Sequence, residues 1–191
     1  MVERPAVCRC LNRVMAAHTP FLDGGLTWIY GAPPPDECPE CSFGWDLAFE
    51  DALRIIAAAP DRFEAALQGR DGMAVPADGS WNAGAYVWHL TDLARGWSER
   101  WVQIQDAPGS RLIGFDPDEL AAARNYRQLP VDPGLWALRQ AVATLLDTTG
   151  RLDRAAVFEH GDWGPGTVAD AIRWLAHEFH HHEQDVIGRA G

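Results

Sequence analysis

The sequence predicts an all-α protein, a four-helix bundle preceded by a small irregular segment that contains cysteines. Residues 44–191 carry four apolar stripes at helical spacing, each of bundle length. Proline, glycine and capping residues mark several of the expected helix ends. All four cysteines lie within the first 41 residues. We therefore expect a cysteine-containing module at residues 1–43 and a helical bundle at residues 44–191.

The N-terminal module is predicted to be irregular, with short strands around the LTWIY stretch. It holds a Gly-Gly pair and three consecutive prolines. Its cysteines form one C-x-C pair and one C-x-x-C pair, and two such pairs can bind a structural zinc ion through four thiolates. Reduced or redox-active thiols without metal are the alternative, and His18 can replace one ligand, although we expect it in an exposed loop. The structural zinc candidates are Cys8, Cys10, Cys38 and Cys41.

The first two bundle helices follow from their apolar positions. The first is expected from about Trp45 to Ala58, with Pro60 bending or restarting it before the chain continues to Gly69. A loop rich in Gly, Pro and Asp leads to the second helix, which opens at Ser80 or Trp81 and reaches about Gln105. Its stripe consists of Tyr86, Leu90, Leu93, Trp97, Trp101 and Ile104.

The last two helices are predicted mainly from their ends. After a short helical piece, FDPDELAAARNYRQ, the third helix has Asp132 as N-cap, Pro133 at its first position and Gly150 past its end. The fourth begins at Thr167, where TVAD resembles a capping box with Asp170 in place of Glu, and ends near Gly188. Connections of mixed length between four such helices are typical of a bundle with one or two long crossovers.

Bulk composition excludes some classes of partner. The net charge of −11 and the pI near 4.9 argue against nucleic acid or an anionic membrane as the main partner. No apolar run approaches the roughly 20 residues of a membrane span, and the N-terminus shows no apolar signal core. We therefore expect a cytoplasmic protein that acts on a small molecule.

The histidines of the fourth helix indicate a metal site. His177 and His181 are spaced i and i+4, so their imidazoles lie on one helix face and can share a divalent metal. His89 of the second helix can supply a third nitrogen, with His160 as the main spare. Three protein ligands leave an open coordination position, which is typical of a catalytic site.

Periodicity alone favours a different pair on the same helix. The apolar stripe of the fourth helix comprises Val168, Ile172, Leu175, Phe179 and Val186. At about 100° per residue, His177 and His181 fall roughly opposite this stripe, whereas Glu178 and His182, also i and i+4, lie nearer to it. An open site at a cleft need not share the core face, so periodicity leaves both pairs as candidates.

Two motifs carry a resemblance to a known family over residues 81–186. The stretch WNAGAYVWHLTDL resembles the Trp-Ser-x-x-Glu-x-x-x-His-Leu-x-Asp helix, and HEFHHHEQ resembles the His-x-x-x-His-x-x-Gln helix, of the DinB/YfiT-like superfamily of metal-binding four-helix bundles. This superfamily includes mycothiol-dependent maleylpyruvate isomerase and the bacillithiol transferases. Ala85 departs from the pattern where the family often has Glu. CPEC before the first helix is similar to the Cys-x-x-Cys-Gly-Phe lead-in of some members.

The resemblance implies a ligand set and a chemistry. In the family the metal is held by a histidine of the second helix and a His/His or Glu/His pair of the last helix, which carries over to His89, His177 and His181. The implied cofactor is a divalent metal, zinc first, with nickel or iron as alternatives. The implied co-substrate is a low-molecular-weight thiol such as mycothiol, activated for S-transfer or isomerisation. The resemblance also implies a homodimer, since DinB-like bundles are commonly dimeric.

Residues around the expected metal complete the hypothesis. Asp92 can orient His89, with a structural cap or a surface charge as the alternative. Gln184 and Asp185 can play a similar role near His181. Tyr126 and Arg124 are candidates to line the cleft, but we expect them to be ordinary surface residues. Two other functions stay open: a non-enzymatic metal-binding or stress-response protein of the same fold, and a hydrolase that uses metal-activated water.

Overall fold

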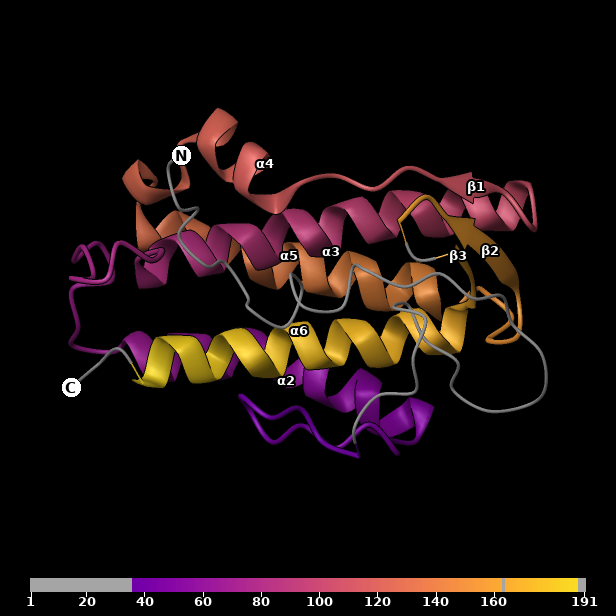
Figure 1. Ribbon diagram of the computed structural model, residues 1–191, viewed down its shortest axis with the longest axis horizontal. Coiled ribbons are helices and arrows are strands. Elements are labelled where there is room, and N and C mark those ends of the chain that lie inside the picture. The colour runs from indigo at the N-terminus through magenta and orange to yellow at the C-terminus, as the bar shows by residue number, and fades with distance from the viewer. Residues whose placement is uncertain (1–35, 163, 189–191) are drawn as a thin grey trace.

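The computed structural model describes residues 36–162 and 164–188. The expected strands around LTWIY and the side chains of Cys8, Cys10 and His18 lie outside the described residues. Within them, four long helices run alongside one another (Figure 1): α2 (Phe49–Leu67), α3 (Ala83–Asp106), α5 (Val131–Thr149) and α6 (Val168–Gly188). The predicted four-helix bundle is confirmed.

The helix ends show which capping predictions hold. At α6 the Thr167 backbone N–H donates to Asp170 Oδ2 (3.1 Å) and the Asp170 N–H donates to Thr167 Oγ1 (3.2 Å), so the predicted capping box is present. The prediction of Asp132 as N-cap of α5 was wrong. The helix begins two residues earlier than predicted, at Val131, with Pro130 at the cap position, and Asp132 lies in the first turn. An acidic residue there still interacts favourably with the helix dipole.

The other boundaries differ by a few residues. The helix α2 begins at Phe49 and not at Trp45, because the Trp45 N–H donates to Asp36 O (3.1 Å) in a preceding turn. It runs unbroken through Pro60, where a bend or restart was expected. Asn82 caps α3, since its side-chain oxygen accepts from the Ala85 N–H at 2.9 Å.

A small sheet closes one end of the bundle, and the sequence did not predict it. Strand β1 (Arg111–Leu112) pairs in parallel with β2 (Val157–His160), which pairs antiparallel with β3 (Gly164–Thr167). His160, expected in a loop, is therefore the buried last residue of β2. Two short helical pieces, α4 (Pro117–Arg124) and η1 (Tyr126–Gln128), link the β1 strand to α5.

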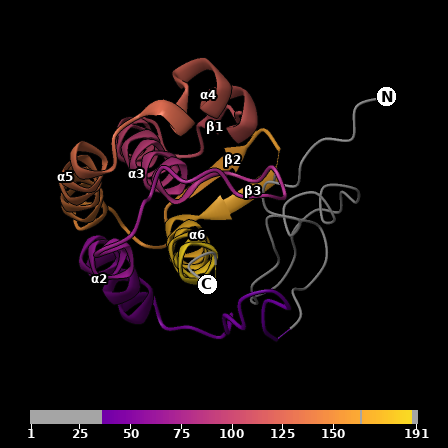
Figure 2. The same cartoon turned by 90° about the vertical axis from the view of Figure 1, so that its left-hand side faces the viewer.

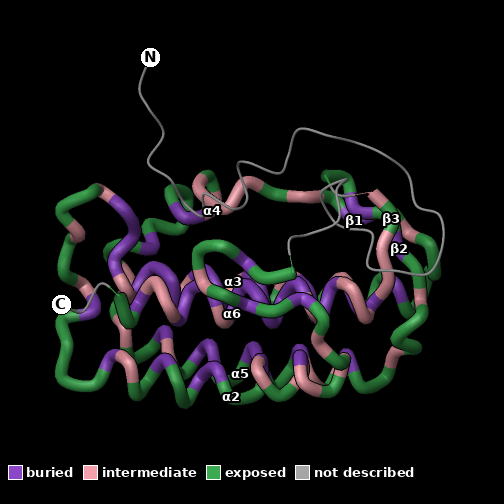
Figure 3. The backbone as a smooth tube through the Cα atoms, turned by 60° about the horizontal axis from the view of Figure 1, so that its bottom comes forward, coloured by how far each residue is buried: buried purple, intermediate pink, exposed green. Residues whose placement is uncertain are grey.

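The helix α6 lies at the centre of this arrangement. It packs on α2 and α3 and touches β3, as the end-on view of Figure 2 shows. Its buried residues occupy most of its circumference, whereas α2 and α5 alternate between buried and exposed faces (Figure 3). Among the described helices, none has the length and hydropathy to cross a membrane. The central position of α6 explains how it can bury several polar side chains.

Candidate metal centres

Buried ionisable side chains gather on the C-terminal half of α6. His177, Glu178, His181 and His182 are each less than 5% exposed. Burying such groups without partners is costly, so buried charges are usually paired or bind metals. Two groups of candidate ligands on neighbouring faces of α6 divide these four residues, and a third candidate group, His181, His182 and Asp185, takes one histidine from each.

The first group joins α6 to α3. His89, Glu178 and His182 each offer a ligand atom, and these atoms lie within 4.8 Å of one another. The rings of His89 and His182 meet edge to face with centroids 5.1 Å apart. Glu178 and His182 are one helical turn apart, so both side chains face the same stretch of α3.

The polar atoms of this group fit a metal. The Nε2 atoms of His89 and His182 are buried and have no hydrogen-bond partner among the described residues. Nδ1 of His182 lies 2.9 Å from Asp185 Oδ2 and donates to it, so Nε2 is the nitrogen that faces the group. A histidine ligand held by a carboxylate in this way is common around protein metals. We conclude that the donor set suits a divalent cation.

Electrostatics agree with a cation at this position. Burial acts to raise the pKa of Glu178, but contact with His177 and His182 holds that pKa well below its usual range. Burial lowers the pKa of His182, but the Asp185 and Glu178 carboxylates raise it to about 9, so a metal bound at Nε2 takes the place of a proton. Burial and the nearby His182 lower the pKa of His89 to about 3, so His89 is neutral, as a metal ligand must be.

The second group joins α6 to the turn before α2. Cys38, Cys41, His177 and His181 offer ligand atoms that also lie within 4.8 Å of one another. Contact with Cys41, then with His177 and His181, drives the pKa of the Cys38 thiol far below its ordinary value, although burial acts in the opposite direction. The two cysteines expected to share zinc with Cys8 and Cys10 thus lie beside two histidines.

The predicted ligand set of His89, His177 and His181 is not brought together. His89 lies with Glu178 and His182, whereas His177 and His181 lie with the cysteines. The physical reason is the 100° step between successive helix residues, which turns His177 and His181 away from α3 and Glu178 and His182 toward it. The apolar periodicity of α6 was the signal that could have identified Glu178 and His182.

The residues expected to orient the ligands fall in three places. Asp92 accepts a hydrogen bond from the Tyr126 hydroxyl (2.6 Å) and pairs with Arg124. Tyr126 is only 1% exposed, so the expectation that it is an ordinary surface residue was wrong. Asp185 holds His182 and lies 3.8 Å from His181 Nε2. Gln184 is half-buried on α6, and its role stays a prediction.

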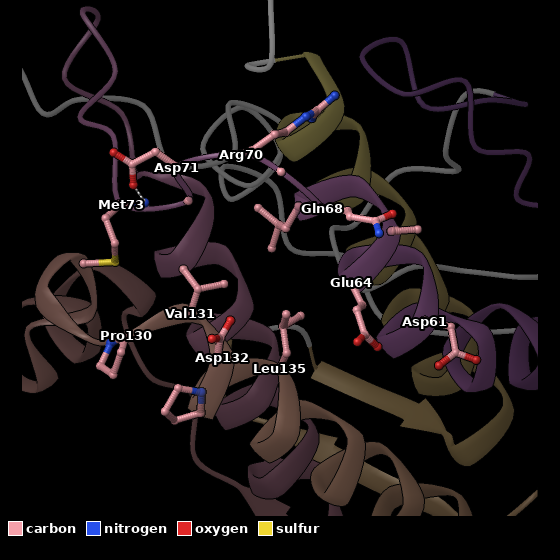
Figure 4. Close-up of a pocket in the computed structure, with 15 residues that line it drawn as sticks. Asp61, Glu64, Gln68, Arg70, Asp71, Met73, Pro130, Val131, Asp132 and Leu135 are labelled. Carbon is pink, nitrogen blue, oxygen red and sulfur yellow. Dashed lines mark hydrogen bonds between the residues drawn. The ribbon is translucent and has the colours of Figure 1, made fainter.

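A separate pocket of about 840 Å³ lies between the end of α2 and the start of α5 (Figure 4). Its lining includes Glu64, Arg70, Met73, Val131 and Leu135, and no member of either metal-ligand group. The pocket therefore adds nothing to the chemistry of those groups.

Comparison with known proteins gives a family and a fold. A family profile described as the DinB superfamily matches residues 58–184. Among solved structures, YfiT from Bacillus subtilis matches with a TM-score of 0.68 and 15% sequence identity, covering 82% of this chain and 90% of YfiT. That structure is described as a probable metal-dependent hydrolase with an unusual four-helix bundle topology. A search of curated proteins finds no match.

Proposed function

Because this chain belongs to the DinB superfamily, we propose that His89, Glu178 and His182 bind a divalent metal that activates a low-molecular-weight thiol for S-transfer or isomerisation. One observation carries the assignment of the ligands. Two buried imidazole Nε2 atoms without hydrogen-bond partners face a buried carboxylate. Such a set is costly to bury unless a cation completes it.

The charge of the donor set favours an anionic co-ligand. Two neutral imidazoles and one carboxylate leave a divalent cation with a net charge of about +1, and three protein ligands are typical of catalytic zinc. When bound, the metal supplies Lewis acidity that lowers the pKa of a nearby thiol or water. A thiolate is the anion that S-transfer and thiol-dependent isomerisation require.

The surrounding side chains hold the ligands in place. The ring of Trp81 lies 5.2 Å from that of His89, and the ring of Tyr86 lies 4.9 Å from that of His182. Both aromatic residues are buried, so they restrict the imidazole rotamers and exclude water on their side of the group. Asp185 fixes the orientation of the His182 ring through the bond to Nδ1.

The neighbouring carboxylates support thiol activation over hydrolysis. Asp185 is engaged with His182, Glu183 accepts a hydrogen bond from Arg62 (2.8 Å), and Glu178 belongs to the ligand set. A free thiol with a pKa of about 8.5 needs a much smaller pKa shift than water at about 15.7 to ionise at neutral pH. A site whose described carboxylates are all occupied is therefore better suited to a thiol.

Metal-dependent hydrolysis is the second candidate, and the similarity in fold to YfiT, described as a probable metal-dependent hydrolase, favours it. The two activities are separable in one experiment on tag-free, metal-loaded protein. Consumption of chlorodinitrobenzene is measured with a panel of low-molecular-weight thiols, and hydrolysis of nitrophenyl esters is measured without thiol. We expect thiol-dependent turnover that is lost in His89→Ala and Glu178→Gln and kept in His160→Gln, a buried histidine outside both groups.

Three results would change the assignment. Ester hydrolysis without thiol transfer would select the second candidate. Full metal occupancy with neither activity would favour a non-enzymatic metal-binding protein. Wild-type turnover by Glu178→Gln would remove Glu178 from the site.

A further inference from the structure

We propose that Cys38, Cys41, His177 and His181 form a second and structural metal site, a tetrahedral zinc centre that fastens the turn at residues 36–45 to α6. This site does not depend on the proposed function, because it shares no ligand with the His89 group. Its spacing is C-x-x-C on the turn and H-x-x-x-H on the helix, which is typical of structural zinc with two cysteines and two histidines.

The turn already has the backbone of a metal knuckle. The Cys38 N–H donates to Phe43 O and the Ser42 N–H donates to Cys38 O, both at 2.8 Å. Ser42 has a left-handed φ of 55°, and Glu37 and Gly44 form an antiparallel bridge. The tight loop brings both cysteine side chains to one side, so two ligands are held without any help from α6.

Side chains of the turn dock it on the histidine face of α6. The ring of Trp45 lies 4.5 Å from that of His177, and the ring of Phe43 lies 5.4 Å from the same histidine. His180 Nε2 lies 3.1 Å from the carbonyl oxygen of Cys41 and donates to it. Three contacts that use no metal therefore place the C-x-x-C pair against the H-x-x-x-H pair.

The ligand atoms lie close to the separation that zinc requires. All four are within 4.8 Å of one another, and Cys38 Sγ lies 4.0 Å from His181 Nδ1. Bonds of about 2.3 Å to sulfur and about 2.0 Å to nitrogen in a tetrahedron place ligand atoms roughly 3.3–3.8 Å apart. Each separation must therefore shorten by no more than about 1.5 Å, which is within the reach of side-chain rotation.

The imidazoles present the correct nitrogens. Both ring nitrogens of His177 are buried without a hydrogen-bond partner in the described part of the chain, and Nδ1 lies 3.4 Å from Glu178 Oε1. Nε2 of His181 lies 3.6 Å from Glu40 Oε2 and 3.8 Å from Asp185 Oδ2, which leaves Nδ1 on the side of Cys38. In His181 one nitrogen faces carboxylates and the other faces Cys38, as expected for a zinc ligand.

The two thiolates and two imidazoles favour zinc as the metal and a structural role for the site. Two thiolates cancel the charge of a divalent cation, so the complete centre is neutral and is suited to burial. Thiolate and imidazole together suit zinc better than magnesium, calcium or manganese. Four protein ligands close the coordination sphere, which is typical of a structural site.

Cobalt(II) spectroscopy tests this assignment. One equivalent of Co²⁺ is added to tag-free, chelator-treated His89→Ala protein, in which the first group lacks one ligand. We expect thiolate-to-cobalt charge transfer in the near ultraviolet and the intense visible bands of tetrahedral cobalt. The charge-transfer band should be lost when Cys38→Ser and Cys41→Ser are added. The intense visible bands should be lost when His177→Gln and His181→Gln are added, and both features should persist with Cys8→Ser and Cys10→Ser.

Two outcomes of the cobalt titration would overturn the proposal. One is an absence of thiolate charge transfer at one equivalent. The other is a spectrum that survives the two histidine changes but is lost with Cys8→Ser and Cys10→Ser, since zinc would then be held by four cysteines. X-ray absorption on zinc-loaded His89→Ala protein needs no change in the cluster: two sulfurs at about 2.3 Å and two nitrogens at about 2.0 Å are expected. A shell of four sulfurs, or of none, refutes the site.

Discussion

Replacing Glu178 by Gln tests the first metal group most directly, because the change keeps the shape of the side chain and removes its charge. Glu178 is 2% exposed, and its carboxylate lies 3.7 Å from His182 Nε2. Removing one partner of a buried charge pair typically costs about 3–5 kcal/mol. The glutamine oxygen remains a neutral ligand, so we take the lower end, about 3 kcal/mol, which corresponds to roughly a hundredfold loss of metal affinity.

The loss of affinity translates into a shift of the melting temperature. With free metal at about 100 times the wild-type Kd, binding stabilises the wild type by about 2.7 kcal/mol and the hundredfold weaker variant by about 0.4 kcal/mol. For a chain of this size, about 1 kcal/mol corresponds to roughly 2–4 °C, so the metal-induced rise in Tm should differ by about 5–9 °C.

Calorimetric titration and thermal unfolding with Mn²⁺ give the measurement, because manganese prefers nitrogen and oxygen ligands and avoids the cysteine group. The matched control is Glu183→Gln, a neighbouring buried carboxylate that is hydrogen-bonded to Arg62 and should leave the manganese-induced shift unchanged. If Glu178→Gln and the wild type show the same Mn²⁺ affinity and the same rise in Tm, Glu178 is not a ligand. The set of His89, His177 and His181 would then regain support.

Three further predictions test the surroundings of the site and the packing of the bundle. Asp92→Asn should leave the Mn²⁺ affinity within a factor of about two, because Asp92 binds Tyr126 and Arg124 and not a metal ligand. The free energy of unfolding should fall by about 1–3 kcal/mol. A large loss of Mn²⁺ affinity would show that Asp92 orients His89. Gly134→Ala should destabilise the bundle by about 1–3 kcal/mol, because the new Cβ would lie 3.0 Å from Trp88 Nε1 and 3.2 Å from Val87 Cγ1. Urea unfolding measures the change, and an unchanged urea midpoint would mean that α3 and α5 separate easily. Burial and Arg100 lower the pKa of His160 from 6.5 to about 3, so its stabilising contribution is complete above pH 6.5 and is lost as the pH falls toward 3. His160→Gln should therefore make the unfolding free energy fall less steeply below pH 6.5, by at most about 1.4 kcal/mol per pH unit. Parallel pH profiles of the variant and the wild type would show that the pKa of His160 is not lowered by folding.

Local signals in the sequence were sufficient for the helices and for one cap. The Thr167–Asp170 capping box and the apolar stripe of α3 depend on side chains a few residues apart, so they can be predicted without knowledge of the fold. The short sheet could not be predicted in this way. Strand β3 contains Gly164, Pro165 and Gly166, which have low strand propensity, and it forms because β2 pairs with it across a turn.

The ligand sets required the tertiary structure. Sequence spacing identified two i and i+4 pairs on α6, and the angle of 100° per residue placed them on neighbouring faces. The angle relative to the apolar stripe favoured Glu178 and His182, but neither spacing nor angle could say that their face meets α3 or that the other face meets the turn containing Cys38 and Cys41. That choice was made by packing around a central helix, where Trp45 and Phe43 cover His177 while Trp81 and Tyr86 lie against His89 and His182. Periodicity describes a helix about its own axis, whereas a metal site depends on which segments meet that helix, and such contacts involve residues far apart in the chain.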